Sequence, residues 1–352
     1  MLTVNQLTLT HRKDLTVLVD SLSFTLNDGE RLALIGEEGN GKSTLLRVLA
    51  GDPSVESYIE VSGSFSCRDS AAYLPQELPE SERALSAYDF FCMSPVFFDQ
   101  SPRELGELAA RLSLPADVFY SDQLMQTFSG GERVKLQLAR LLMSNPTTLL
   151  LDEPTNDLDS DSVLWLENFL LSCKLTVLFV SHDEALLSRT ATSILLLERL
   201  RRRQVPRATL YRMGYDPFYA ERGAAFEKQT RIARKEREDF DAKMERYDAI
   251  RRKVERDQNA ISRQDPHGSR LLKKKMHTVQ AMGRRFEREQ ENMTAMPEQE
   301  EAIFAKLDCA PLPADKTVLD LSCAELSVGG RTLCRDIRLT VRAREKLCIC
   351  GH

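Results

Sequence analysis

The sequence predicts an α/β fold in which a parallel sheet carries a phosphate-binding loop, followed by a long helical hairpin. Residues 31–35 form an apolar run that leads directly into a glycine-rich loop at 36–43, and a helical pattern follows at 44–50. A second apolar run, 149–151, has no polar alternation, which is typical of a strand buried on both faces of a parallel sheet. Hydrophobic residues then recur every seven positions within 226–293, which predicts paired helices.

Length and composition limit the class of protein. The 352 residues allow two or three domains, and 42% hydrophobic residues suffice for a sizeable core. No run approaches the roughly 18 apolar residues of a membrane span, and the first residues lack a signal-peptide pattern. The eight cysteines have no metal-ligand spacing. We therefore expect a cytoplasmic protein with reduced thiols and no membrane insertion.

The net charge of −5 conceals two oppositely charged parts. Residues 199–288 hold 26 Lys and Arg against 13 Asp and Glu, which leaves the rest of the chain at a net −18. One segment is therefore a basic element in an acidic protein, which suits an anionic partner.

The loop at 36–43 has the residue order and the strand–loop–helix context of a P-loop. Its glycines let backbone N–H groups converge on phosphate oxygens, and the helix N-terminus favours the same anion. Lys42 is expected to reach the β- and γ-phosphates, and the Ser43 hydroxyl to ligate Mg²⁺. The alternative is a turn that binds nothing. The residues predicted to hold the nucleotide are Gly36, Glu37, Glu38, Gly39, Asn40, Gly41, Lys42, Ser43 and Thr44.

The segment SGGE predicts a capped helix. It consists of Ser129, Gly130, Gly131 and Glu132, and a Ser three residues ahead of a Glu is a capping box. The two glycines leave backbone N–H groups approachable by an anion. Apolar residues at helical spacing then predict about four turns of helix, which stops at residues 145–146.

Two carboxylates follow the apolar run at 149–151. Asp152 and Glu153 lie at the carboxyl end of the predicted strand, where open α/β sheets place their ligands. Asp152 is predicted to act on Mg²⁺, and Glu153 to orient or deprotonate the water that attacks the γ-phosphorus. The alternative for Glu153 is an acid that only favours the start of the next helix.

Together these motifs resemble those of an ABC-type ATPase: SGGE the signature motif, LLLDEP the Walker B motif and residues 156–159 the D-loop. The resemblance implies two further roles. Gln76, in the segment YLPQ, matches the Q-loop and would sense Mg²⁺ and the attacking water. His182, which follows the predicted strand 177–180, matches the H-switch and would contact the γ-phosphate. The alternatives are a Gln in an ordinary turn and a structural His.

Two positions depart from the usual ABC pattern. The resemblance places an aromatic residue that stacks on adenine where this sequence has His11. An imidazole stacks less strongly than a tyrosine, and a solvated turn residue is the alternative. Glu38 stands where such loops often have Asn, and a carboxylate near phosphates weakens their binding unless it points outward.

The heptads predict an antiparallel helical hairpin broken at residues 265–269. Each arm is expected to measure about 40–50 Å. The heptad residues are Phe226, Ala233, Phe240, Tyr247, Val254 and Ile261 in the first arm and Leu272, Val279, Phe286 and Met293 in the second. The basic residues at the tip are Arg263, Arg270, Lys273, Lys274 and Lys275. They form either a solvated face or a cationic tip that a rigid arm delivers to phosphates.

With the exit segment 211–219, which is rich in Tyr and Gly, the hairpin resembles the linker of the ABC-F family. That family carries two ATPase halves on one chain and no membrane domain. The resemblance implies that the hairpin reaches the tRNA-bearing site of the ribosome, so rRNA and tRNA are the expected partners. The alternative for the exit segment is an aromatic-rich turn that packs beneath a helix.

The end of the chain weakly repeats its beginning. Residues 336–341 align with 21–26, and Gly351 falls on Gly36, as expected for a second ATPase domain that stops at the first glycine of its P-loop. The predicted domains are an ABC ATPase domain at 1–212, the hairpin linker at 213–313 and the start of a second ABC ATPase domain at 314–352.

The predicted function is that of an ABC-F ATPase that uses ATP and Mg²⁺ on the ribosome, as a translation factor or an antibiotic-resistance protein. In such proteins the P-loop of one half faces the signature motif of the other half. The second half is therefore an expected partner, and hydrolysis by this chain alone is expected to be negligible. The alternatives are the ATP-binding subunit of a membrane transporter and a DNA-associated ABC ATPase.

Overall fold

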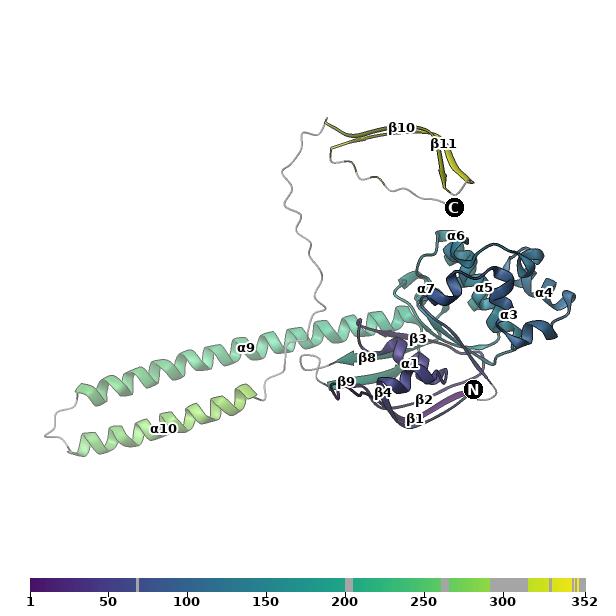
Figure 1. Ribbon diagram of the computed structural model, residues 1–352. Helices are drawn as coiled ribbons and strands as arrows, with labels where there is room; N and C mark the ends of the chain where they lie inside the picture. Colours follow the sequence, from purple (N-terminus) through teal and green to yellow (C-terminus); the bar gives the residue numbers. More distant parts are fainter. Residues whose placement is uncertain are drawn as a thin grey trace. The chain divides into compact units, whose positions relative to one another are not determined.

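The computed structural model describes residues 1–67, 70–199, 205–260, 266–291, 316–328 and 331–343, together with residues 345 and 347. The chain forms two compact units, 1–295 and 296–352. The first contains a mixed α/β body and a pair of long helices, and the second contains a β-hairpin (Figure 1). The predicted α/β fold followed by a long helical segment is confirmed.

A six-stranded sheet forms the centre of the first unit, in the order β5-β6-β7-β3-β8-β9. The first five strands run parallel, and β9 pairs antiparallel with β8. The strands are β3 (Arg31–Gly36), β5 (Ala71–Leu74), β6 (Thr148–Asp152), β7 (Thr176–Val180), β8 (Ser193–Arg199) and β9 (Val205–Tyr211). Every residue of β6 and β7 is buried, as their unbroken apolar runs predict.

One face of this sheet is covered by α1 (Lys42–Leu49) and a second sheet. The second sheet is antiparallel, in the order β2-β1-β4, with β1 (Leu2–His11), β2 (Val17–Leu26) and β4 (Ile59–Cys67). Leu45, Leu46 and Leu49 of α1 pack into a core shared by both sheets.

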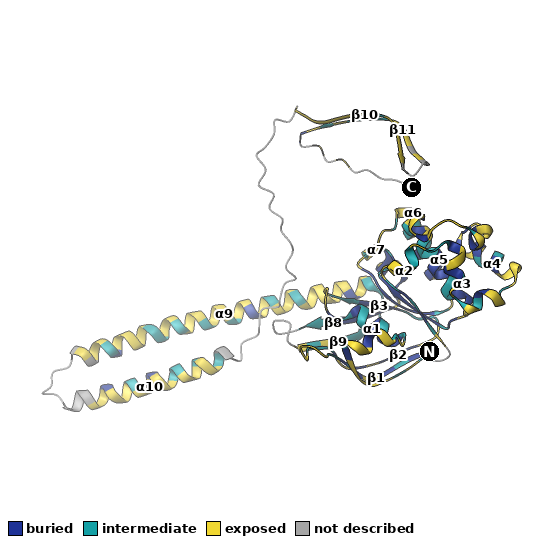
Figure 2. Ribbon diagram, viewed as in Figure 1, coloured by how far each residue is buried: buried dark blue, intermediate teal, exposed yellow. Residues whose placement is uncertain are grey.

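The other face is covered by helices, of which the longest are α5 (Gly130–Met143), α6 (Ser160–Ser172) and α4 (Pro102–Leu112). The remaining elements of the body are α2 (Glu80–Arg83), α3 (Ala87–Cys92), α7 (Glu184–Thr190) and four short 3₁₀ helices, η1 (Pro53–Ser57), η2 (Pro95–Asp99), η3 (Ala116–Tyr120) and η4 (Met125–Thr127). Buried residues concentrate in the strands and in the helix faces against them (Figure 2).

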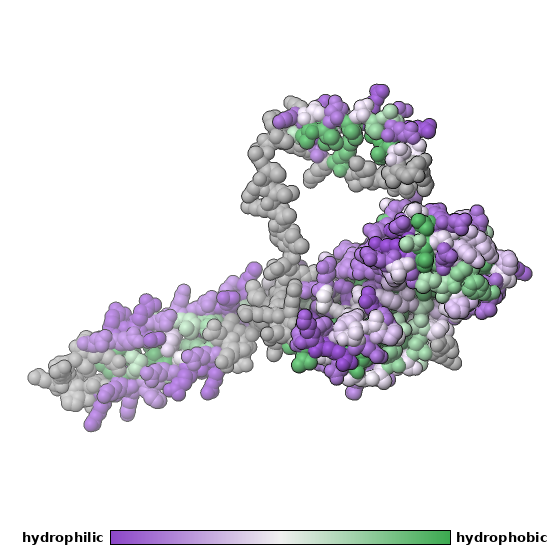
Figure 3. Space-filling model, in the orientation of Figure 1, coloured by the Kyte–Doolittle hydropathy of each residue, from purple (hydrophilic) through white to green (hydrophobic). Residues whose placement is uncertain are grey.

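Two long helices follow the sheet, α9 (Tyr215–Ala260) and α10 (Pro266–Glu291). They run antiparallel, because Phe286 near the end of α10 contacts Phe240 and Tyr247 in α9, at ring-centroid distances of 6.2 and 5.5 Å. Lys243 also pairs with Glu289. Polar side chains cover the outer faces, and hydrophobic ones lie between the helices (Figure 3).

Phe286 of α10 lies against Phe240 and Tyr247 of α9 at the contact between the arms, and the other described heptad residues are buried or half-buried as well. Ala233, Val254, Leu272 and Val279 are buried, and Phe226, Phe240, Tyr247 and Phe286 are half-buried. With 46 residues, α9 is about 70 Å long, longer than expected. The reason is that the exit segment is already helical from Tyr215. Of the predicted hairpin residues, Ile261, Arg263, Asp265 and Met293 lie outside the described residues.

The predicted break at 265–269 is too long, because α10 already begins at Pro266. A proline in the first helical turn costs no hydrogen bond, since that N–H has no partner within the helix. Among the described residues, no helix is long and apolar enough to cross a membrane.

The second unit contains β10 (Thr317–Val328) and β11 (Arg331–Arg342), which pair antiparallel as β1 and β2 do. Asp336 and Ser21, which the sequence aligns, both have a left-handed backbone, with φ of 53° and 48°. Non-glycine residues rarely adopt this conformation. The shared feature supports the repeat seen in the sequence, although Gly351 lies outside the described residues.

Candidate functional site

The glycine-rich loop leaves β3 at a point where the backbone of β8 lies close. A Cβ on Gly36 would lie 2.4 Å from the carbonyl oxygen of Leu197, so only glycine fits there. Gly41 caps α1 with φ of 84°, a conformation that favours glycine. Asn40 is buried and donates from Nδ2 to the oxygen of Leu197, at 3.1 Å. The loop is therefore fixed against β8.

The Lys42 side chain lies within the loop. Its Nζ donates to the carbonyl oxygens of Gly36, at 2.6 Å, and Glu37, at 3.1 Å, and only 7% of the residue is exposed. Burial lowers the pKa of its ammonium group. Four carboxylates act in the opposite direction: Glu153, Glu38, Asp152 and Glu37. Four negative groups thus act on one positive group in this site.

Ser43 and Asp152 meet beside the loop. The Ser43 hydroxyl donates to Oδ1 of Asp152 at 3.0 Å, and Asp152 is 1% exposed. The other carboxylate oxygen, Oδ2, accepts from the hydroxyl of Tyr73 at 3.0 Å. Burial raises the pKa of the Asp152 carboxyl, against the two hydrogen bonds, which lower it. Sequence analysis missed the Tyr73 contact.

Glu153 lies at the centre of the predicted catalytic residues. Its Oε2 accepts from Gln76 Nε2 at 3.2 Å, and its Oε1 lies 3.6 Å from His182 Nε2. Asn156 Nδ2 also donates to Oε2, at 2.8 Å, which the sequence did not predict. Glu153 has φ of 46°. This backbone conformation is uncommon and costs energy, and residues that adopt it are often found at functional sites. The structure thus brings Gln76, His182 and Glu153 together.

His11 lies at the end of β1, in a turn with Asp14. Its Nδ1 is 3.0 Å from Asp14 Oδ1, and its ring centroid is 6.5 Å from that of Tyr58. These contacts hold the ring in the turn and leave its side chain 33% exposed. Glu37, Glu38 and Gly39 are also exposed, at the outer side of the loop.

With this geometry in place, the chain can be compared with known proteins. Residues 19–156 match the family model described as ABC transporter. The chain is 28% identical over 375 residues to the ATP-binding protein Uup of Escherichia coli strain K12, covering 95% of this chain and 53% of that one. It is 29% identical over 392 residues to the tylosin resistance ATP-binding protein TlrC of Streptomyces fradiae, covering 97% and 68%. Over residues 19–156 the chain is therefore similar to ABC ATPase domains, and over nearly its whole length it is similar to ATP-binding proteins of the ABC-F type.

A third relative is elongation factor 3 of Phytophthora infestans, 34% identical over 185 residues, with 52% of this chain and 17% of that one covered. The chain spans about a third of the length of other curated ATP-binding proteins that it matches. The resemblance to ABC-F proteins, inferred from the motifs and the linker, is confirmed, and an ATP-binding ABC domain is established for this chain.

The SGGE segment forms the predicted capping box. The Ser129 Oγ accepts from the N–H of Glu132 at 3.3 Å, and Glu132 Oε2 accepts from the N–H of Ser129 at 2.8 Å. Gly130 packs closely on residue Asp157, since a Cβ added at this glycine would lie 2.1 Å from the carbonyl oxygen of Asp157. Gly131 packs in the same way on Ser162 of α6. The two glycines therefore serve packing within this domain as well.

We expect Gly130→Ala to destabilise the chain in the absence of nucleotide. The clash is with a backbone atom, which cannot rotate away, so the cost should be about 1–3 kcal/mol of unfolding free energy. Gly106→Ala is the matched control, since open space surrounds that position in α4 and alanine favours a helix. Thermal unfolding checks both. Equal melting temperatures for Gly130→Ala and wild type would contradict the packing role.

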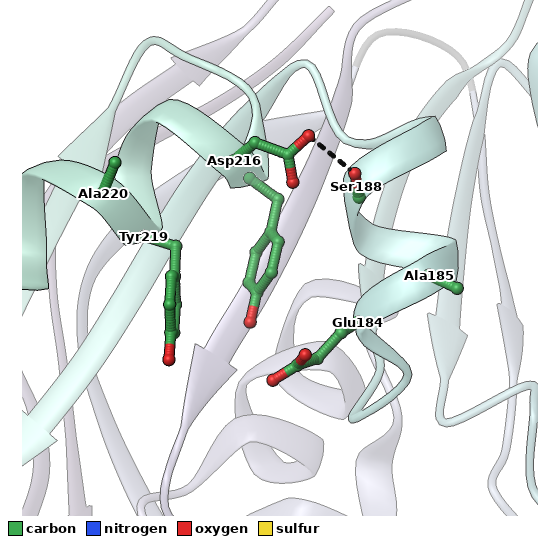
Figure 4. A pocket seen from close by; sticks show the side chains of 7 residues that line it. Glu184, Ala185, Ser188, Asp216, Tyr219 and Ala220 are labelled. Atoms are coloured by element: carbon green, nitrogen blue, oxygen red, sulfur yellow. Dashed lines mark hydrogen bonds between the residues drawn. The ribbon is translucent and has the colours of Figure 1, made fainter.

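A hollow of about 380 Å³ lies apart from the P-loop, between α7 and the first turn of α9 (Figure 4). At one side of it, the Ser188 hydroxyl donates to Asp216 Oδ2 at 2.8 Å. Burial and the nearby Glu184 raise the pKa of the Tyr215 phenol. Since α7 begins two residues after His182, these contacts join the segment that follows His182 to the start of α9. The lining residues are Glu184, Ala185, Ser188, Tyr215, Asp216, Tyr219 and Ala220.

Proposed function

We propose that the chain binds ATP together with Mg²⁺ at the P-loop and hydrolyses it with Glu153 as the general base. The observation that carries this proposal is the convergence of Gln76 and His182 on the Glu153 carboxylate. Glu153 follows Asp152 directly, so this group lies beside the hydrogen-bonded pair of Asp152 and Ser43. Such a strained and acidic arrangement is suited to a site where a water must be activated next to a phosphate.

The residues of this site fit Mg²⁺. Hard cations prefer oxygen ligands, and the Ser43 hydroxyl and the Asp152 carboxylate supply them. Because the Ser43 proton points to Asp152, the lone pairs of its oxygen remain available to a cation. Four carboxylates around Lys42 would also repel a triphosphate unless a cation accompanies it. Ser43 and Asp152 would thus hold the ion, with Gln76 beside them.

The chain's own groups then have distinct roles. When bound, Mg²⁺ would neutralise charge on the phosphates. Lys42 would exchange its two carbonyl contacts for phosphate oxygens, with the backbone N–H groups of the loop around them. Glu153 Oε1 would accept the proton of the attacking water, because Gln76 and Asn156 already occupy Oε2. His182 would contact the γ-phosphate from the other side of Glu153.

Turnover is proposed to need a signature motif from another ATPase domain. In this arrangement Ser129, Gly130, Gly131 and Glu132 serve a nucleotide bound to that other domain. At the start of α5, the N–H groups of such a motif are suited to an anion. His11 is proposed to contact the adenine, with a weaker stack than a tyrosine would give.

For the partner, we propose the ribosome, contacted through α9 and α10, with rRNA and tRNA as the groups bound. The support is the exposed basic side chains of Arg270 and residues 273–275 on α10, set in an otherwise acidic chain. The names of two relatives, an elongation factor and a tylosin resistance protein, agree with a role in translation or in antibiotic resistance. A ribosomal partner would place the protein in the cytoplasm.

Binding of ATP is tested with a fluorescent ATP analogue that carries an N-methylanthraniloyl group. Lys42→Ala should weaken MgATP binding about 10- to 100-fold, since a hydrogen bond to a charged group contributes roughly 1.5–3 kcal/mol. Lys174→Ala removes an exposed lysine in the turn before β7 and should leave the affinity unchanged. The same preparation should hydrolyse ATP negligibly until a second ATPase domain is added. Equal affinities for Lys42→Ala and wild type would remove the P-loop from nucleotide binding.

The competing functions are separated by sedimentation of the natural protein with purified ribosomes, with membrane vesicles and with duplex DNA. Salt-sensitive sedimentation with ribosomes alone is expected. Sedimentation with vesicles would instead indicate a transporter subunit, and with DNA a DNA-associated ATPase. The long hairpin of α9 and α10 is the observation that favours the ribosome or DNA over a transporter.

A further inference from the structure

Both oxygens of the Asp152 carboxylate are engaged by other side chains. Ser43 donates to Oδ1 and Tyr73 to Oδ2, each at 3.0 Å. The Tyr73 hydroxyl in turn accepts from Nε of Arg47, at 3.4 Å. The four residues form one hydrogen-bonded chain beside the P-loop, in which Asp152 is 1% exposed.

The fold explains why these residues meet. Ser43 and Arg47 are one turn apart on α1, so they lie on the same face of that helix. Tyr73 pairs with Leu150 in the parallel register of β5 and β6. Asp152 is two residues beyond Leu150 and therefore on the same face of the sheet, about 6.6 Å further along the strand. The long phenol of Tyr73 spans that offset.

The direction of each hydrogen bond in this chain is determined. An arginine can only donate, so the Tyr73 oxygen accepts from Arg47. Its single proton is then directed to Asp152. With Oδ2 held in this way, rotation of the carboxylate is restricted, and Oδ1 stays directed at the Ser43 hydroxyl.

We propose that Tyr73 is a positioning residue that orients Asp152, and through it Ser43, for binding the cation that accompanies the nucleotide. The inference rests on the proposed MgATP function and assigns a role to a residue of the YLPQ segment to which the motifs assign none. Groups that orient a metal ligand from outside the ligand set commonly change metal affinity 10- to 100-fold when they are removed. Arg47 supports the same chain from α1, one step further from Asp152.

A purely structural tyrosine would behave differently. Tyr73→Phe keeps the ring that packs among the core residues of the two sheets and removes only the hydroxyl. A structural role would therefore change the melting temperature and leave the response to Mg²⁺ unchanged. A positioning role changes the Mg²⁺ concentration needed for tight nucleotide binding and leaves binding without Mg²⁺ unchanged.

The experiment titrates Mg²⁺ into the full chain with the methylanthraniloyl ATP analogue present, and reads its fluorescence. We expect Tyr73→Phe to raise the half-saturating Mg²⁺ concentration about tenfold, with the affinity measured in EDTA unchanged. Arg47→Gln should shift the half-saturation in the same direction by less. Tyr58→Phe is the matched control, because its hydroxyl also contacts Arg47 but does not extend the chain to Asp152.

Four outcomes are decisive. A shift in Tyr73→Phe that Tyr58→Phe lacks supports the positioning role. Identical Mg²⁺ curves for Tyr73→Phe and wild type overturn it, and so does an equal shift in Tyr58→Phe. Wild-type binding that does not respond to Mg²⁺ at all overturns the proposed MgATP function itself. If Tyr73→Phe does not fold, as judged by circular dichroism, Arg47→Gln decides by the same comparison.

Discussion

Glu153→Gln should lower the rate of ATP hydrolysis by the natural protein about 10²- to 10⁴-fold, the usual contribution of a general base. The affinity for MgATP should stay within about threefold of wild type, because the change keeps the shape of the side chain. Gln76 and Asn156 both donate to Oε2 of Glu153, and the amide oxygen of a glutamine can accept both bonds in the same place. The amide nitrogen then replaces Oε1, the oxygen that faces His182. That position can no longer take a proton from water.

The measurement is phosphate release under multiple turnover, with nucleotide affinity measured in parallel. Glu107→Gln is the control, since this exposed glutamate on α4 pairs only with Arg103 on the same helix turn among its described ion pairs. It should hydrolyse ATP at the wild-type rate. Because two ATPase halves share the work in ABC-F proteins, the corresponding glutamate of a second half is replaced as well. The ATP-bound form should then accumulate. Turnover at the wild-type rate would remove Glu153 from the catalytic role.

Much of this site could be predicted because its chemistry is local in sequence. The P-loop is a run of eight residues between a strand and a helix, and the capping box at Ser129 and Glu132 spans four. The paired helices were also predictable, because hydrophobic residues such as Phe240 and Tyr247 recur every seven positions, which is the spacing of helices that pack side by side. In each case the residues that cooperate lie within about one or two helical turns.

Two of the contacts that sequence analysis missed join residues far apart in the chain. Tyr73 reaches Asp152 only because β5 and β6 are neighbours in the sheet. The sequence of neither strand specifies which strand it pairs with. Asn40 was assigned to the nucleotide, but its side chain binds Leu197 of β8. Residues 77–127 received no prediction, since their short helices are held by packing around Phe90, Phe91 and Phe119 rather than by any repeat.

The start of α9 shows how tertiary packing overrides a local pattern. The exit segment has a glycine and a proline, which favour a turn. In the structure Pro217 lies in the first helical turn, where a proline is tolerated, and Phe218 is buried against Tyr211 at a ring-centroid distance of 4.9 Å. The alternative interpretation of this segment, aromatic residues that pack beneath a helix, describes part of the outcome. The helix itself begins about ten residues earlier than the heptads indicate.

Replacing Lys273, Lys274 and Lys275 together with Gln should weaken association with ribosomes and flatten its dependence on salt. All three side chains are exposed on α10, while Leu272 and Val279 on the same helix are buried against α9. Each phosphate contact that is lost should lower the slope of log K against log salt concentration by about 0.7–0.9. The helix should persist, because Gln is about as good a helix former as Lys.

The control must remove the same charge from the same hairpin. Replacing Lys228, Arg234 and Lys235 with Gln does so at exposed positions of α9. These positions lie roughly 40 Å along the helix from its C-terminal end. Ribosome binding is measured over a salt series for wild type and both triple variants, with circular dichroism to confirm helix content and the ATP analogue to confirm unchanged nucleotide affinity. If the tip contacts RNA, only the variant at 273–275 loses slope. If both variants lose slope equally, the hairpin acts through its total charge, and if neither does, the three lysines form only a solvated face.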